Sequence, residues 1–199
     1  MRFALTVLAI ALVALVTAAG TAYVAITNEL FVNKLTSGPW SARLFQAALD
    51  ADPYSLAIRT RNSTIPTPIA EAVEFTSNTD SAGKRLVGRC SYQLIGRMPA
   101  SRIWTIAIEL PDGAAERNPA IRPTNYPDDP YATHSGVVLR QEDGTVRIQI
   151  AATVRPGNWL QVRTSGPFSL VTRLYDTPIG EDLRRNPVEL PRIEQVSCR

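Results

Sequence analysis

The chain has 199 residues, of which 45% are hydrophobic, and this length favours one domain with one sizeable core. Twenty-one Lys and Arg residues against 18 Asp and Glu residues give a formal net charge of +3. The basic residues are scattered, with Arg184-Arg185 as the only adjacent arginine pair. Binding to nucleic acid normally requires clustered Lys and Arg side chains, so we expect no nucleic-acid partner.

Residues 3–26 contain no charged side chain and consist mostly of Ala, Val, Leu and Ile. As a helix they would extend about 36 Å, enough to cross a hydrocarbon core of about 30 Å. The sequence therefore predicts that these residues insert into a membrane, and we assign residues 1–27 to a signal anchor. A cleaved signal peptide is the alternative, because Thr17-Ala18-Ala19 offers a cleavage site, although the apolar run continues to Ile26.

Arg2 precedes the apolar segment, and positive charge at this end favours a cytoplasmic N-terminus. The residues that follow the segment are therefore expected to be exported. Cys90 and Cys198 fit an oxidising compartment and could pair with each other. Two unpaired thiols are the alternative, because sequence alone does not determine pairing.

Residues 28–62 are expected to form a short helical connector. Apolar residues from Trp40 to Leu49 recur at spacings of three and four, which predicts a short amphipathic helix. Asp52-Pro53 is typical of an N-cap followed by Pro at the first helical position. This pair predicts a second short helix from Tyr54 to Arg61.

Residues 63–199 are expected to form a mainly β domain, an antiparallel sandwich, because short segments with frequent Pro and Gly show no βαβ alternation. Trp104, Ile106, Ile108 and Leu110 share one face of a strand, and Val146, Ile148 and Ile150 share one face of another. Asp143-Gly144 is typical of a hairpin turn. The predicted strands are Ala72–Ser77, Gly88–Leu94, Arg102–Leu110, Gly136–Gln141, Thr145–Ala151 and Phe168–Tyr175.

The interval 111–135 carries four Xaa-Pro pairs between Asn118 and Pro130, which keep the backbone extended or turned. Loops of this length inside a compact domain are often functional. An ordered wrap over one end of the sandwich is the alternative. The predicted binding surface, for an envelope protein or a glycan, consists of Tyr126, Asp128, Asp129, Tyr131 and His134.

The sequence offers no recognisable catalytic motif. One histidine and two distant cysteines give no zinc spacing, so we expect no metal and no cofactor. His134 and Ser135 would point to opposite faces of an extended chain, which makes a Ser/His/Asp triad geometrically poor. Carboxylates for glycoside hydrolysis could come from Glu109, Asp112 or Glu116, although a surface role is the ordinary interpretation. We therefore favour a non-catalytic binding or accessory module, with a hydrolase or carbohydrate-active enzyme using the 111–135 loop as the alternative.

Three short pieces near the C-terminus carry a family resemblance: Asn158-Trp159-Leu160, Gly166-Pro167-Phe168 and Arg173-Leu174-Tyr175. They resemble the C-terminal signature of the bacterial family called domain of unknown function 1214, in its short, membrane-anchored proteobacterial form. Other pieces of the chain that look like this form include Gly38-Pro39-Trp40, Asp52-Pro53-Tyr54, Gly88-Arg89-Cys90 and Cys198.

The resemblance implies a jelly-roll-like β-sandwich after the N-terminal transmembrane helix and one or two short helices. It implies no accepted catalytic residues. The expected location is the bacterial inner membrane, crossed once by residues 3–26, with the C-terminal domain in the periplasm. Within the signature, Trp159, Gly166, Pro167 and Phe168 are predicted to be structural, with the two rings filling the core on either side of the Gly-Pro corner.

Overall fold

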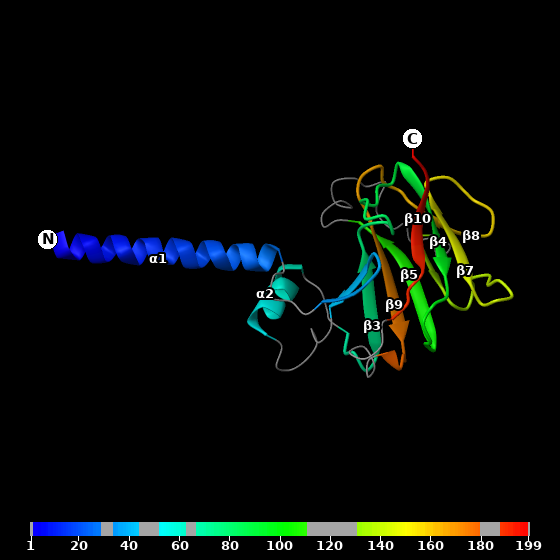
Figure 1. Cartoon of the computed structure of the whole chain (residues 1–199), viewed down its shortest axis with the longest axis horizontal. Coiled ribbons are helices and arrows are strands. Elements are labelled where there is room, and N and C mark those ends of the chain that lie inside the picture. Colours follow the sequence, from blue (N-terminus) through cyan, green and yellow to red (C-terminus); the bar gives the residue numbers. More distant parts are fainter. Residues whose placement is uncertain are drawn as a thin grey trace. The chain divides into compact units, whose positions relative to one another are not determined.

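The computed structural model describes residues 2–28, 34–43, 52–62, 67–110, 131–179 and 188–198. These residues belong to two compact units, one helical and one formed by β-strands (Figure 1). The helical unit contains α1 (Arg2–Thr27) and α2 (Pro53–Asn62).

Helix α1 is long and apolar enough to cross a membrane, and its large apolar side chains from Phe3 to Val24 are exposed. This exposure is what a membrane anchor or a signal sequence requires, because a soluble core helix would bury those side chains. At the C-terminal end of α1, Oγ1 of Thr27 accepts a hydrogen bond of 3.1 Å from Nη1 of Arg61 in α2. The same guanidinium lies 5.9 Å from the ring centroid of Tyr23, a cation–π contact.

Helix α2 begins as its sequence predicts. The Oδ1 atom of Asp52 accepts hydrogen bonds from the backbone N–H groups of Tyr54 and Ser55, both at 3.0 Å, and Pro53 occupies the first helical position. The hydroxyl of Ser55 donates to Oδ2 at 2.6 Å. This bond and the bonds from the backbone lower the pKa of Asp52, so the cap remains ionised well into the acidic range.

The β unit consists of two sheets packed face to face (Figure 1). All neighbouring strands are antiparallel except β7 and β8, which are parallel. The six-stranded sheet has the order β1 (Lys34–Ser37), β2 (Trp40–Arg43), β3 (Ala72–Ser77), β9 (Ser169–Tyr175), β5 (Ile103–Glu109), β6 (Ala132–His134). The four-stranded sheet has the order β10 (Arg192–Cys198), β4 (Cys90–Gly96), β7 (Val146–Ala151), β8 (Asn158–Gln161).

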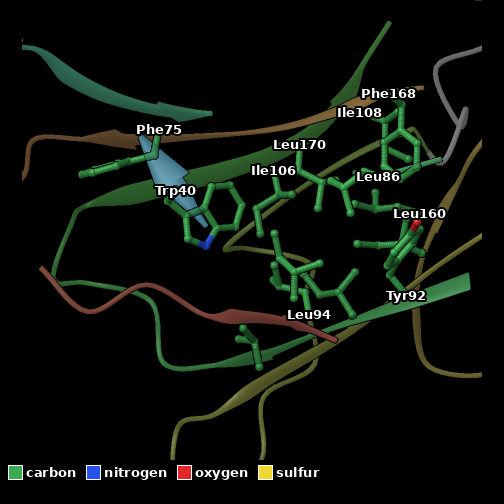
Figure 2. Close-up of a cluster of buried hydrophobic side chains, with 14 of the residues drawn as sticks. Trp40, Phe75, Leu86, Tyr92, Leu94, Ile106, Ile108, Leu160, Phe168 and Leu170 are labelled. Carbon is green, nitrogen blue, oxygen red and sulfur yellow. The ribbon is translucent and has the colours of Figure 1, made fainter. Parts of the chain in front are cut away.

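Alternating side chains of the two sheets form one hydrophobic core (Figure 2). Trp104, Ile106 and Ile108 enter it from β5, and Ile148 and Ile150 enter it from β7. The alternation that predicts these two strands is therefore confirmed, as is the mainly β fold class. The jelly-roll connection of the strands stays a prediction.

The helix predicted from Trp40 to Leu49 is wrong where the structure describes it, because Trp40–Arg43 is strand β2. A turn with Gly38 at a φ of 56° joins β1 to β2, and Ser41 of β2 pairs with Thr76 of β3. Residues 34–43 thus belong to the sandwich, whereas the sequence predicts that they are part of the helical connector at 28–62.

The strand predicted from Gly136 to Gln141 is also wrong, because this segment makes only the isolated bridge between Arg140 and Val146. The turn after it is confirmed. Gly144 has a φ of 81° and donates from its N–H to the carbonyl of Gln141 at 2.9 Å, while Asp143 Oδ1 accepts from the Thr145 N–H.

Residues 192–198 form β10 at the edge of the four-stranded sheet, where the sequence pattern predicts no strand. Ile193 of β10 is fully buried, and its N–H and carbonyl bond the hydroxyl and N–H of Ser81. Cys198 forms a disulfide with Cys90 of β4 across a sequence separation of 108 residues. The predicted pairing of the two cysteines is therefore present in the structure.

Candidate functional site

The outer face of the six-stranded sheet carries a row of polar side chains. Thr105 of β5 pairs with both His134 of β6 and Arg173 of β9, and Arg173 pairs with Glu74 of β3. Partners in antiparallel strands carry their side chains on the same face, with Cβ atoms about 4.5–5.5 Å apart. The register therefore aligns four polar residues that lie far apart in the sequence.

Arg173 is the centre of this row. Its Nε atom lies 2.7 Å from Oε2 of Glu74, and its Nη2 atom lies 3.0 Å from Oε1 of Glu109. Partial burial alone would lower the pKa of Arg173, but the two carboxylates outweigh burial and raise it. Two carboxylates for one guanidinium leave a formal charge of −1. We call Glu74, Thr105, Glu109, His134 and Arg173 the outer-face array.

Within the described residues, the side chains of His134 and Ser135 bond backbone N–H groups and not each other. The Nδ1 atom of His134 accepts a hydrogen bond of 3.2 Å from the Gly136 N–H, so this residue bonds its own turn. The Ser135 hydroxyl oxygen accepts from the Trp104 N–H at 3.4 Å. Both side chains therefore accept hydrogen bonds from backbone N–H groups near β6. This agrees with the expectation that two adjacent residues are poorly placed to act as a catalytic pair.

Of the predicted binding residues, Tyr131 and His134 are described, and both are exposed. The carbonyl of Tyr131 accepts from the Ile108 N–H at 2.9 Å, which places Tyr131 beside the end of β5. Tyr126, Asp128 and Asp129 lie outside the described residues, as do Asp112 and Glu116. Within the described ranges, no three His, Cys, Asp or Glu side chains gather in a way that could hold a metal ion.

Residues 71–179, more than half of the chain, match the family described as "Protein of unknown function (DUF1214)". The chain belongs to this family. The match confirms the family named from the signature pieces, and the family description gives no activity. No curated protein matches the chain.

Two solved structures are similar to this member of the DUF1214 family. The VPA0106 protein from Vibrio parahaemolyticus has a TM-score of 0.55 and 22% identity over 74% of this chain and 36% of its own. An uncharacterized protein from Burkholderia cenocepacia has a TM-score of 0.43 and 18% identity, covering 68% of this chain and 32% of its own. This chain thus spans about a third of each, and the likeness to VPA0106 supports the fold alone.

Within the DUF1214 signature, the two rings differ in position. Phe168 is 2% exposed and packs its ring edge to face with Tyr92, at 5.9 Å between centroids. Trp159 is only partly buried, and it lies on the outer face because its neighbour Leu160 enters the core. The prediction that Phe168 fills the core agrees with the structure, whereas the same prediction for Trp159 is wrong.

The Gly-Pro corner between these rings is a packing point. Gly166 accepts at its carbonyl from the Gly88 N–H at 2.8 Å, and Pro167 forms a β-bridge with Val87. At Gly88 a Cβ atom would lie 1.6 Å from the carbonyl oxygen of Thr164, so only glycine fits this approach. The Gly-Pro part of the signature therefore fixes how two backbone segments pack against each other.

Proposed function

We propose that this protein is an envelope protein, anchored in the bacterial inner membrane by α1, whose β-sandwich lies in the periplasm and acts as a non-catalytic binding module. The observation that carries the proposal is the disulfide between Cys90 and Cys198 in a chain that begins with an exposed apolar helix. Structural disulfides persist in oxidising compartments and are rare in the cytosol of mesophiles. An N-terminal apolar helix of this kind directs export of the chain, and a disulfide is stable in the oxidising periplasm.

The chemistry of the outer-face array supports binding more than catalysis. Glu74 and Glu109 are both engaged by Arg173, so the arginine holds the two carboxylates that a general acid and base would need. His134 is the exposed member of this array on β6, and the exposed Tyr131 directly precedes that strand. We infer that a partner protein or a glycan of the envelope contacts this edge.

Reporter fusions to the C-terminus of the full chain test the location. Alkaline phosphatase is active only after export, whereas green fluorescent protein fluoresces when it folds in the cytoplasm. We expect phosphatase activity without fluorescence, and the reverse pattern after deletion of residues 2–27. A fluorescent, phosphatase-inactive full-length fusion would reject the envelope location.

Cross-linking in intact cells tests the binding edge. We expect Tyr131→Ala and His134→Ala to reduce at least one cross-linked species obtained with the wild-type chain. Lys84→Ala, a change of an exposed side chain in another loop, is the matched control. Identical cross-linking patterns for all four chains would remove the β6 edge from the proposed surface.

A further inference from the structure

The outer face of the four-stranded sheet carries a second row of side chains. Gln93 of β4 pairs with Glu194 of β10 on one side and with Gln149 of β7 on the other, and Gln149 pairs with Trp159 of β8. Neighbouring strands lie about 4.8 Å apart, so the four side chains follow one line across the sheet. We call Gln93, Gln149 and Trp159 the glutamine–tryptophan row.

The two glutamines in this row have unused hydrogen-bonding capacity. Each amide offers two N–H donors and an acceptor oxygen, and neither Gln93 nor Gln149 makes a side-chain hydrogen bond within the described residues. Both side chains are partly buried, which limits the water that can reach them. A ligand that donates and accepts hydrogen bonds would satisfy them better than a purely anionic or cationic ligand.

Trp159 gives this row a fixed aromatic surface. Its indole Nε1 donates a 3.1 Å hydrogen bond to the carbonyl oxygen of Ala151, which holds the ring against the sheet. The side chain of Trp159 remains partly exposed, whereas Ala151, to which it is bonded, is only 1% exposed. A rigid ring of this kind presents a large apolar contact area at a small entropic cost.

Two arginines and one glutamate lie around the glutamine–tryptophan row, which gives a small formal charge of +1. Glu194 lies beside Arg192, with 3.8 Å between Oε1 and Nη2, and Arg147 lies one row away. No basic cluster is available for a phosphate backbone on this face of the described sheet. The chemistry therefore favours an uncharged ligand.

We propose that the glutamine–tryptophan row binds an extended, uncharged glycan of β-1,4-linked pyranose rings. Such a sugar has an apolar C–H face, which stacks on the indole of Trp159, and hydroxyl groups at its edge, which exchange hydrogen bonds with the amides of Gln93 and Gln149. The linear row suits a linear chain of sugar rings. This site lies on the sheet opposite the outer-face array, so it goes beyond the function proposed above.

Tryptophan fluorescence can follow this binding directly. The chain has three tryptophans, and two of them, Trp40 and Trp104, are 1% and 3% exposed. The full chain in a detergent without sugar groups would be titrated with the β-1,4-linked tetramer of N-acetylglucosamine and with cellotetraose. We expect a saturable change with at least one of them and none with the α-linked maltotetraose.

Glutamine variants decide the proposal, because Trp159→Ala also removes the bond to Ala151. We expect the double variant Gln93→Ala/Gln149→Ala to weaken binding at least tenfold, as measured by the shift in the titration midpoint. Gln141→Ala, at an exposed glutamine in the turn before β7, should bind as the wild type does. Equal affinity in the double variant, or no saturable change with either β-linked tetramer at millimolar concentration, would overturn the proposal. The reporter fusions test location independently of this result.

Discussion

The indole Nε1 of Trp40 donates a 2.7 Å hydrogen bond to the carbonyl oxygen of Pro191, which follows it by 151 residues. Trp40 belongs to β2 in the six-stranded sheet, and Pro191 directly precedes β10 in the four-stranded sheet. Both residues are buried. This single bond therefore links an early hairpin to the C-terminal strand across the sandwich.

Trp40→Phe should destabilise the β-sandwich because it removes the indole donor and leaves the Pro191 carbonyl buried without it. The unsatisfied group alone costs about 1–3 kcal/mol in the free energy of unfolding. Urea unfolding followed by circular dichroism measures the loss. Trp159→Phe is the matched control and should cost less, since that ring is partly exposed. A larger loss for the control would contradict the assignment of Trp40 to the core.

Gly88→Ala should disrupt the packing between residues 88 and 164. The new Cβ atom would lie 1.6 Å from the Thr164 carbonyl oxygen, so one of the two backbone segments must move. We expect a loss of more than about 3 kcal/mol, in the range of severe overpacking. Gly166→Ala is the control, because its Cβ atom would meet only the Thr164 hydroxyl, at 3.4 Å. Equal melting temperatures for the two variants would show that the predicted clash is absent.

Thr172→Val should keep or increase stability. The Thr172 hydroxyl is fully buried on the inner face of β9 and has no hydrogen-bond partner among the described residues. Valine has the same shape without the polar oxygen, and an unpaired buried hydroxyl costs about 1–3 kcal/mol. Thermal unfolding should show an equal or higher melting temperature. A clear decrease would indicate that this hydroxyl has a partner.

Tyr92→Phe should change how stability depends on pH. Burial raises the pKa of Tyr92 above 10.0, with a smaller contribution from the negative charge of Asp80, and the Val87 N–H and Arg89 oppose the shift. Since the folded protein disfavours the phenolate, the stability of the wild type is complete below pH 10 and falls as the pH rises above that value.

The same variant leaves the Val87 N–H without the tyrosine oxygen, so it should be less stable than the wild type by about 1 kcal/mol at neutral pH. Denaturant unfolding between pH 7 and about pH 11, a range that includes the ordinary tyrosine pKa, should show the two curves converging. Parallel curves would mean that the Tyr92 hydroxyl titrates in the folded protein as it does in the unfolded chain.

Strands with a clear alternation of apolar and polar residues could be predicted from the sequence. The bounds of Ala72–Ser77 agree with β3, and the segments around Trp104 and Ile148 agree with β5 and β7. Short or peripheral strands could not be predicted in this way. Four residues of β2 are too few to separate a period of two from helical spacing, and only Ile193 in β10 is buried.

The site could be predicted only in part. Tyr131 and His134 are exposed, but no local pattern indicates that His134 shares a sheet face with Thr105, Arg173 and Glu74, because β-pairing between distant segments creates that row. The family signature predicts that Trp159 fills the core. Its strand position decides otherwise, since Leu160 enters the core and the adjacent residue must then face outward.

The redox state of the cysteines in living cells tests the envelope location most directly. Mass spectrometry of the full chain from cells that express it, alkylated without reduction at the moment of lysis, counts free thiols. We predict no alkylated cysteine and a Cys90–Cys198 cross-linked peptide, because an exported sandwich folds in an oxidising compartment. Two alkylated cysteines in every chain would place the sandwich in a reducing compartment and contradict the account.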